Sequence, residues 1–452
     1  MTRSWTSRHA GEPALRVAVV GGGAAGVITA VHLLREATPE RPVDVRIVER
    51  GPLLGPGLAY AQDHPRLTVN NYAGRLSALV DEPDHLLQWC ARHGRDVGPT
   101  DFPRRAEYGA YLTDLLDEVV VPQGSALGRV RGVATDVVDT STALEVVLTG
   151  GWSVPADVVV LALGNPPPRA YPGATAHPGY IADPWTPDLA DRLEGASEVL
   201  LLGTGHTMVD VLGQLQETMP MARFTAVSRE GRLPATHRRT AMPLHETFEP
   251  DVSSLDALLD QVEQRVRQKQ ADGGDWRDVL DSIRASGNDI WQALSPEEQR
   301  RFVAEVSRTW ERLRHRMSPD LADFVAAMQH SARLRVLTVE SVDLQQYDAV
   351  VNCTGPAPVQ TRGWNRLVDT LLDRGTIRGH HHGLGLDLDT DGHVVTREGV
   401  AHPRIVAVGA ARKGLEWEVT AIPDLRSQAA TVARGLLGTN HVVRREVGAS
   451  TA

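Results

Sequence analysis

The sequence predicts an α/β fold in which one doubly wound parallel sheet is inserted into another. The first indication is a set of short runs rich in Val, Ile and Leu, each ending in glycine or another small residue: "VAVVGGG", "VVVLALG", "VLLLGTG", "AVVNCTG" and "IVAVGAA". Continuous apolar runs of this length are typical of parallel strands that are buried on both faces. The second indication is the helical spacing of residues 24–36 and 207–217, which places helices between the strands.

Length, charge and cysteine content limit the class of protein. A chain of 452 residues is too long for one simple core, so we expect two or three domains. The net charge of -10 argues against a nucleic-acid partner, which needs a basic face. No apolar run or leader suggests a membrane partner, so we expect a cytoplasmic protein, and a homo-oligomer is compatible with the composition. Only Cys90 and Cys353 occur, without a C-x-x-C pair, which argues against a disulfide framework and dithiol chemistry.

The order of the strands predicts the domain boundaries. The first domain is expected over residues 14–165 and again over 333–440, with the second domain over 166–332, after the hinge "GNPPPRAYPG", and flexible termini at 1–13 and 441–452. Residues 251–332 have apolar positions at helical spacing in polar surroundings, so we expect a helical insertion there. Within it, "SPEE" is a helix start signal with Ser295 as N-cap.

The run "VAVVGGGAAG" carries a complete Gly-x-Gly-x-x-Gly fingerprint. Gly21 allows the tight turn, Gly23 lets the backbone approach a pyrophosphate, and Gly26 lets helix and strand pack closely. The amides of Ala24 and Ala25 open the following helix, whose N-terminus favours an anion. A glycine-rich turn without a ligand is the alternative interpretation.

The end of the next expected strand indicates which cofactor this turn binds. Glu49, followed by Arg50, is placed to accept hydrogen bonds from ribose hydroxyls, which favours the unphosphorylated ribose of FAD or NAD. FAD is preferred because the chain returns late to the same domain, with a strand ending at Gly409 and a helix beginning near Ala421 and Ile422. The start of that helix is expected at the pyrimidine edge of a flavin. Gly164, after the strand "VVVLALG", is assigned to the same site.

A second, less complete fingerprint occurs in "VLLLGTGHTMVD". Gly203 and Gly205 match the first two glycines, but Met208 stands in place of the third. The next strand ends in Ser228 and Arg229 instead of an acid, and a hydroxyl beside a guanidinium suits a ribose 2′-phosphate. We therefore expect NADPH here, with two further contacts from the first helical residues, His206 and Thr207. The alternatives are a vestigial fold element and, for His206, a helix cap without a ligand.

Several segments together resemble the flavin-dependent monooxygenases that include N-hydroxylating and Baeyer–Villiger enzymes, and above all the FAD/NAD(P)-binding family related to them. The segment "FPRRAEYGAYL" is similar to the P-x-R-x-E-[FY]-x-x-Y motif of the N-hydroxylases, and it supplies Pro103, Arg105, Glu107, Tyr108 and Tyr111. "VVNCTGP" and "WEVTAIPDLRSQA" are also similar to that family. The Baeyer–Villiger fingerprint is incomplete, since "HPGYIADPW" has Asp183 near its histidine position.

The resemblance implies a monooxygenase that uses FAD, NADPH and oxygen. One oxygen atom would pass from a flavin (hydro)peroxide to a small substrate, with an amine or amino-acid nitrogen favoured over sulfur or a carbonyl carbon. Asn71 or Asn70 would donate a hydrogen bond to the flavin or to the peroxide, and Arg105 would hold the flavin or the nicotinamide. The alternative for Arg105 is an ordinary ion pair with Glu107. Two other functions stay open: a flavin oxidase or reductase without oxygen transfer, and a non-catalytic FAD/NAD(P)-binding protein.

Two basic runs have less specific interpretations. In "RLRHR", Arg314 and Arg316 are candidates for binding a substrate carboxylate, with a solvated helix face as the alternative. The run "HHH" at 380–382 lies between glycines that indicate a loop. Three adjacent histidines cannot all face one ion on a helix, so we expect no metal site.

Overall fold

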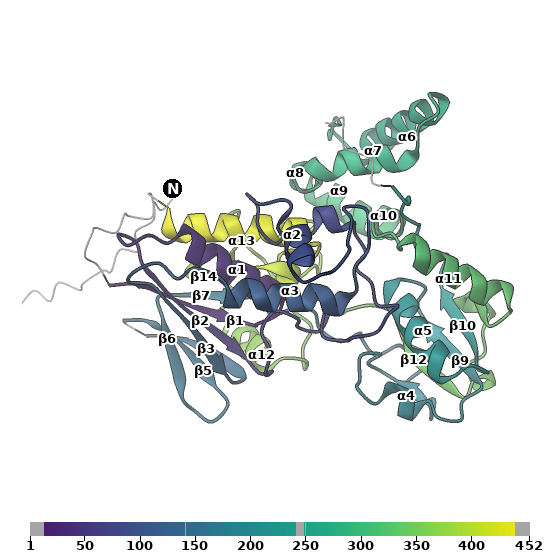
Figure 1. Cartoon of the computed structure of the whole chain (residues 1–452), viewed down its shortest axis with the longest axis horizontal. Helices are drawn as coiled ribbons and strands as arrows, with labels where there is room; N and C mark the ends of the chain where they lie inside the picture. The colour runs from purple at the N-terminus through teal and green to yellow at the C-terminus, as the bar shows by residue number, and fades with distance from the viewer. Residues whose placement is uncertain (1–12, 141, 241–247, 249, 439–452) are drawn as a thin grey trace, which may run out of the picture.

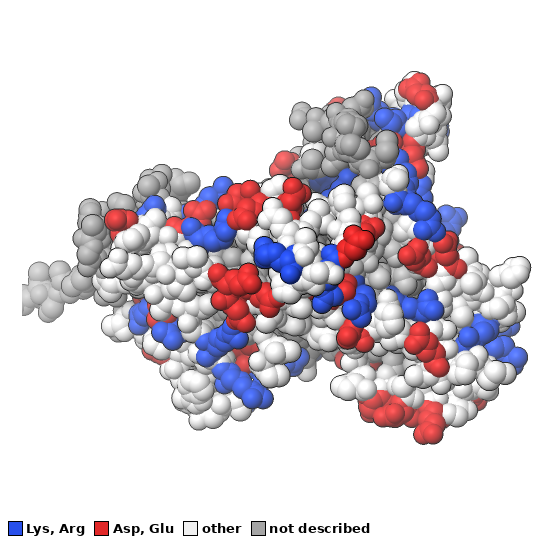
Figure 2. Space-filling view, viewed as in Figure 1, with Lys and Arg blue, Asp and Glu red and all other residues white. Residues whose placement is uncertain are grey.

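The computed structural model describes residues 13–140, 142–240, 248 and 250–438. Figure 1 shows two sheets side by side, with a lobe of short helices above the second sheet. In the described part of the chain, no helix is both long and apolar enough to cross a membrane. Basic and acidic side chains are interspersed over the face in Figure 2, so this face offers no single-sign patch to a polyanion.

The first sheet has six strands in the order β13-β14-β7-β1-β2-β3. The strands are β1 (Leu15–Val20), β2 (Val43–Glu49), β3 (Ala126–Arg131), β7 (Val158–Leu161), β14 (Ala401–Ala407) and the antiparallel β13 (His393–Val395). β1 and β7 lie at the centre and are buried on both faces, as the apolar runs predict.

Alternate residues of the first sheet build two separate cores. Val17 and Val19 face α1 (Ala24–Glu36), α3 (Arg105–Asp117) and α13 (Ile422–Leu437), with α2 (His85–Arg92) at the edge of this core. Ala18 and Val20 face the opposite side, where a three-stranded antiparallel sheet, β4 (Ala134–Asp139), β5 (Leu144–Leu148) and β6 (Ser153–Ala156), packs together with α12 (Arg366–Arg374). The sheet is therefore covered on both faces.

The second sheet has five parallel strands in the order β11-β10-β9-β12-β8. The strands are β8 (Tyr180–Ile181), β9 (Glu198–Leu202), β10 (Arg223–Ser228), β11 (Leu334–Thr338) and β12 (Ala349–Asn352). Its helices are α4 (Leu189–Arg192), α5 (His206–Thr218) and α11 (Pro319–His330), which bury Leu189, Met208 and Leu321 in one core beside the sheet.

The structure corrects the expected end of the second domain. β11 and β12 follow residue 332, where the sequence was expected to return to the first domain, yet they pair in parallel with β10 and β9. The buried Val350 and Val351 of β12 make that strand an interior member of the second sheet. The predicted helical insertion also ends earlier than residue 332, because α11 packs on the second sheet.

The helical lobe contains α6 (Leu255–Ala271), α7 (Trp276–Ile283), α8 (Gly287–Ala293), α9 (Pro296–Arg301) and α10 (Ser307–Arg314). Two short helical turns, Arg284–Ser286 and Phe302–Val306, join helices of the lobe. Other short turns lie outside the lobe, at Ala73–Arg75, Val339–Ser341, Leu344–Gln346 and Gly409–Arg412. Ser295 accepts a hydrogen bond from the backbone N–H of Glu298, which confirms the predicted N-cap of α9. The lobe rests on the first domain, since Trp291 Nε1 donates to Gly414 O at 2.9 Å.

Candidate active site

The first glycine-rich turn joins β1 to α1 in a geometry that requires glycine. Gly21 has a φ of +110°, and a Cβ there would lie 2.1 Å from Ala162 O. A Cβ on Gly26 would lie 1.9 Å from Gly21 O, so the helix packs directly on the turn. A Cβ on Gly23 would meet only Gly57 Cα, at 3.5 Å. α1 begins with Ala24 and Ala25, and the open face at Gly23 suits a phosphate approaching its N-terminus.

Glu49 ends β2 beside this turn. Its Oε2 accepts from Gly22 N at 2.7 Å, and its Oε1 accepts from Gly51 N at 2.8 Å. A carboxylate has about four acceptor positions, so these two bonds fix the side chain and leave capacity for ribose hydroxyls. Arg50 is exposed beside it.

Two further strands end near the same place. Gly409, with a φ of +71°, follows β14, and a Cβ there would lie 3.4 Å from Ala25 Cβ on α1. Gly164, with a φ of +70°, follows the adjacent β7 and has open space around it. α13 begins at Ile422 with Ala421 as N-cap, which confirms the predicted helix start. Ala421 has no polar side chain to cap the helix, so its first amides remain available to a ligand oxygen.

The two glycines of the second glycine-rich turn differ in the space around them. Gly203 has a φ of +117°, and a Cβ there would lie 2.4 Å from Cys353 O. Gly205 is the N-cap of α5, and a Cβ there would meet nothing within 4 Å. The open side of Gly205 is therefore where a pyrophosphate can approach, next to Thr207. Met208, in place of the third glycine, is fully buried in the core beside the second sheet.

The end of β10 presents the expected hydroxyl and guanidinium. Ser228 Oγ lies 3.0 Å from Thr204 Oγ1 and accepts from Gly231 N at 3.1 Å, so the turn holds it in place. Arg229 is exposed at the end of the same strand. This arrangement fits a 2′-phosphate more readily than a bare ribose.

His206 opens α5 and is held by the end of the helical lobe. Its Nε2 lies 2.9 Å from His315 O, which requires a proton on Nε2. Burial, reinforced by His315 and Arg105, lowers the pKa of His206 to about 4. His206 is therefore neutral at physiological pH.

The two candidate asparagines differ in their surroundings. Asn71 is buried, and its Oδ1 accepts from Tyr72 N at 2.9 Å, which leaves the side-chain amide N–H groups as donors. Asn70 is exposed, but its backbone oxygen lies 3.0 Å from His237 Nε2. Asn71 is thus the better placed donor.

Arg105 does not form the ion pair with Glu107 that was considered as an alternative. Its Nη2 donates to Asp210 Oδ1 at 3.0 Å, and its Nε donates to Thr68 O at 3.1 Å. Glu107 instead accepts from Arg104 N at 2.9 Å, in a capping box at the start of α3. Arg105 therefore ties the first domain to the first turns of α5.

Arg314 and Arg316 do not lie on a solvated helix face. Their side chains are 9% and 2% exposed, at the end of α10. Arg316 Nη1 lies 3.0 Å from Asp281 Oδ1, while Arg314 Nη2 lies 3.5 Å from Glu418 Oε2. The structure overturns that alternative.

Several titratable residues at the site were not predicted from the sequence. They are buried or nearly so, and they come from separate elements: Asp210, His237, Asp281, Arg284, Glu418 and Asp424. A signal existed for Asp210, a charge within the apolar face "MVDVL" of α5. The others lie far apart in the chain, and only the fold brings them together.

The histidine run 380–382 lies in a loop, with the His381 and His382 ring centroids 3.9 Å apart. Among the described residues, one group could hold an ion: Asp389, Asp391 and His393. Asp389 already accepts backbone bonds from Asp391 N at 3.0 Å and His393 N at 2.8 Å. Those bonds account for the cluster as a turn.

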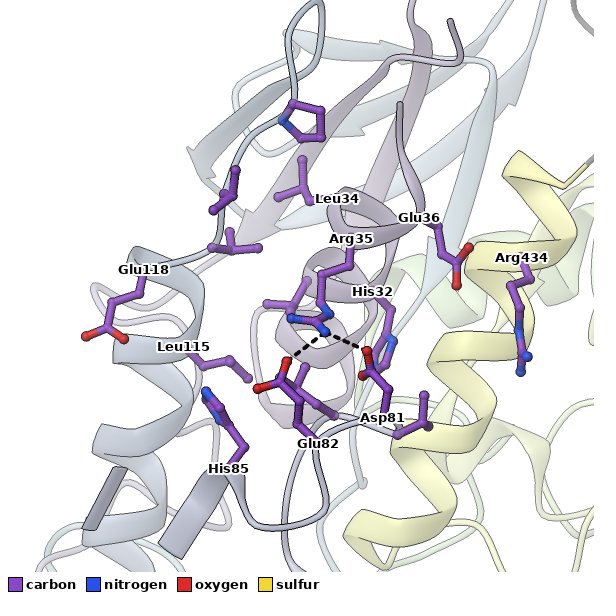
Figure 3. Close-up of a pocket in the computed structure, with 16 residues that line it drawn as sticks. His32, Leu34, Arg35, Glu36, Asp81, Glu82, His85, Leu115, Glu118 and Arg434 are labelled. Atoms are coloured by element: carbon purple, nitrogen blue, oxygen red, sulfur yellow. Dashed lines mark hydrogen bonds and ion pairs between the residues drawn. The ribbon is translucent and has the colours of Figure 1, made fainter. Parts of the chain in front are cut away.

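A cavity of about 660 Å³, drawn in Figure 3, is lined by no residue of either glycine-rich turn. It is lined by the last turns of α1, by the end of α3 and by residues 79–85. Arg35 pairs with Asp81 and Glu82 across it, at 2.7 Å each. Since α1 spans about 20 Å, this cavity is at the opposite end of the helix from Gly23 and is not part of the candidate site.

Comparisons with known proteins agree with the predicted fold. Residues 18–166 match a family model described as FAD-NAD(P)-binding, so this part of the chain is an FAD/NAD(P)-binding domain. No curated protein matched the sequence.

Solved structures resemble the chain over nearly its whole length. The reduced ornithine hydroxylase of Pseudomonas aeruginosa has a TM-score of 0.61 at 15% identity, covering 94% of this chain and 99% of the other. The FAD-bound cadaverine monooxygenase of Erwinia amylovora has a TM-score of 0.59 at 12% identity, covering 96% and 97%. A bacillithiol disulfide reductase of Staphylococcus aureus has a TM-score of 0.53 at 11% identity, covering 94% and 99%. At these identities the likeness establishes a two-domain flavoprotein fold, which hydroxylases and a reductase share.

Proposed function

We propose that the protein is an FAD- and NADPH-dependent monooxygenase that transfers one oxygen atom of O2 to the nitrogen of a small amine or amino acid. The observation that carries the proposal is the link between Arg105 and Asp210. Arg105 also holds Thr68 O, three residues before the buried Asn71. The first turns of α5, where a nicotinamide cofactor would bind, are thereby held beside the segment assigned to the flavin.

The residues of each turn fit their proposed cofactors. Gly21, Gly23 and Gly26 form the close turn that suits the FAD pyrophosphate, and Glu49 has acceptor capacity left for its ribose. Gly205 is open toward the NADPH pyrophosphate, while Ser228 and Arg229 are positioned for the 2′-phosphate. When bound, the flavin supplies the electron-transfer and oxygen chemistry.

The protein contributes orientation, hydrogen bonds and exclusion of water. Asn71 donates from a buried position, where a hydrogen bond to a developing negative charge is stronger than in water. His206 stays neutral, so it adds no charge beside the nicotinamide position. No general acid–base triad is needed, because the positioned cofactors carry the reaction.

An NADPH oxidase or reductase without oxygen transfer is the second candidate, since the fold is shared with a disulfide reductase. Reduction of a disulfide is not favoured here: Cys90 and Cys353 are both buried and belong to different domains. A non-catalytic binding protein is the third candidate and rests only on Met208. Such a protein would bind FAD, but NADPH would not reduce the bound flavin.

The test follows the bound flavin directly. Protein loaded with FAD is mixed anaerobically with NADPH or NADH, and the loss of flavin absorbance is recorded. We expect fast bleaching by NADPH, and on admission of air a product with one added oxygen when a suitable amine is present. Stoichiometric hydrogen peroxide with every amine would favour the oxidase, and absence of bleaching would overturn both redox functions.

A further inference from the structure

Three buried arginines gather between the helical lobe and the segments assigned to the flavin. Arg314 is the last residue of α10 and Arg316 lies two residues beyond it, while Arg284 follows α7, with its side chain 12% exposed. On the other side lie Glu418 and Asp424, which flank the start of α13. The following inference rests on the proposed function and names the class of its substrate.

The cluster contains more hydrogen-bond donors than acceptors. Nε and Nη2 of Arg314, the same two atoms of Arg284, and Nη2 of Arg316 are buried without a hydrogen-bond partner in the described part of the chain. The nearest acids do not satisfy them, since Arg284 Nη2 lies 3.6 Å from Asp424 Oδ2 and Arg314 Nη2 lies 3.5 Å from Glu418 Oε2. Buried charged donors without acceptors are costly, so a ligand that brings oxygens is the natural partner.

The arginines also act on one another. Burial, together with the smaller effect of the neighbouring Arg314, lowers the pKa of Arg284 to about 10. Burial likewise lowers the pKa of Arg316, against the opposing effect of Asp281 and with the help of Arg314. With a pKa of about 10, the Arg284 guanidinium nevertheless remains protonated at neutral pH. An anion among them relieves this mutual repulsion.

A histidine at the edge of the cluster presents a free acceptor. His237 Nε2 faces Asn70 O, which can only accept, so Nε2 carries the ring proton and Nδ1 does not. Nδ1 is buried and has no hydrogen-bond partner. Burial, followed by the effect of Arg316, lowers the pKa of His237 to about 3, so Nδ1 stays unprotonated. It can therefore accept an N–H from an amine.

We propose that the substrate is an amine bearing two carboxylates, bound by Arg284, Arg314 and Arg316, with its nitrogen oriented by His237 Nδ1. One carboxylate has about four acceptor positions, of which bidentate pairing with a single guanidinium uses two, whereas the arginine cluster has five donor atoms without a partner. Unsatisfied donors on three separate guanidinium groups therefore call for more than one carboxylate. A diamine brings only donors and would find few acceptors, chiefly Asp424 Oδ2 and His237 Nδ1.

Binding is tested without turnover. Calorimetry on the FAD-loaded protein uses succinate as an unreactive dicarboxylate and 1,5-diaminopentane as a diamine. We expect succinate to bind more tightly than the diamine, and Arg314→Met or Arg316→Met to weaken it about tenfold or more. Arg308→Met is the matched control, since Arg308 is on the same helix, is exposed and pairs with Glu230. Tighter binding of the diamine, or equal succinate affinity in all three variants, would overturn the proposal.

A further variant tests the proposal even if the arginine variants fail to fold. Glu418→Gln keeps an oxygen for Trp310 Nε1, which donates to Glu418 Oε1 at 3.0 Å, but removes a negative charge beside Arg314. Succinate should then bind several-fold more tightly, an effect that a purely structural role would not produce. If Arg314→Met lowers FAD content while succinate affinity is unchanged, the guanidinium contacts the flavin and the proposal is wrong.

The two proposals fail in different experiments. Flavin bleaching by NADPH requires no amine, so its absence overturns the proposed function, while arginine-dependent succinate binding still supports a dicarboxylate site. Conversely, bleaching followed by oxygenation of diamines in preference to amino dicarboxylates supports the monooxygenase and overturns the substrate class.

Discussion

Arg105 on α3 and Asp210 on α5 form the buried ion pair that joins the two dinucleotide-binding units. Arg105 Nη2 lies 2.8 Å from Asp210 Oδ2, and the two side chains are 17% and 3% exposed. Burial raises the pKa of Asp210, and Arg105 opposes that effect. Arg105 therefore offsets part of the cost of burying the Asp210 carboxylate in a packed interface, where its partner is hard to replace.

Removing one member of this pair should cost more than removing both. Arg105→Met leaves Asp210 buried without its cation, and we expect a loss of about 3 kcal/mol in the free energy of unfolding. In the double variant Arg105→Met/Asp210→Asn, most of that loss should be recovered. Urea denaturation of the parent, the two single variants and the double variant measures the coupling. Additive losses would mean that the two side chains act independently.

The two glycines of the second turn should respond differently to alanine. Gly205→Ala meets open space, so the fold should be kept, but a methyl group at the open face should weaken NADPH binding about tenfold. Gly203→Ala places a Cβ 2.4 Å from Cys353 O at a positive φ, so the domain itself should be destabilised. Thermal melting and NADPH titration separate the two effects. Unchanged NADPH affinity in a stable Gly205→Ala protein would place the pyrophosphate elsewhere.

Strand and helix positions at the two turns were predictable because they depend on local signals. The run before Gly21 is apolar throughout and the helix from Ala24 starts where the glycines end, so residue pattern alone locates β1 and α1. The return to the first domain was misplaced because β11 and β12 resemble any buried strand. Which sheet they join depends on pairing with β10 and β9, and that is a long-range choice.

The candidate site also combines positions that local sequence predicts with positions that it does not. The places of Gly205, Ser228 and Arg229 at a helix start and a strand end could be predicted from spacing along one chain segment. The environment of Arg314 could not be predicted in this way, because a basic helix end has the same sequence whether water or Glu418 lies beside it. Burial is a property of the assembled lobe and first domain, and it decided between the two interpretations.

The preference for NADPH over NADH should depend on Arg229. Arg229→Ala should raise the KM for NADPH by about tenfold and leave the KM for NADH unchanged, since only NADPH has a ribose 2′-phosphate for the guanidinium to bind. Arg239→Ala is the matched control, because Arg239 is exposed but pairs with Asp320 and Asp323. Initial rates of flavin reduction give both constants. An equal loss with both nucleotides would contradict the assignment.

Restoring the missing third glycine should not improve the second site. Met208 is fully buried in the core between α5 and the second sheet. Met208→Gly removes that side chain and adds the entropic cost of a helical glycine, so we expect a loss of about 3–5 kcal/mol in the free energy of unfolding. Met208→Leu should cost less than about 1.5 kcal/mol. Tighter NADPH binding in a stable Met208→Gly protein would show that the methionine impairs the site.

Stability should fall in mild acid because His206 is held neutral in the folded protein. Its pKa is lowered to about 4, chiefly by burial, while the unfolded chain has the ordinary value of about 6.5. Between these values the unfolded state binds one more proton at this residue, so acid favours unfolding. The stability is fully present above about pH 6.5 and is lost as the pH falls toward 4. At pH 5 the loss from this residue is about 2 kcal/mol.

The variant His206→Gln isolates this contribution. Glutamine can still donate to His315 O but does not titrate, so the slope of unfolding free energy against pH should decrease by about one proton between pH 6 and 4.5. His237, whose pKa is lowered to about 3 mainly by burial, keeps its own slope in that variant. Met208→Leu, on the same helix, should retain the full slope. An unchanged slope in His206→Gln would mean that the imidazole is already hydrated in the folded protein. Since His206 lies at the first turn of α5, this edge of the proposed nicotinamide site would then be open to water.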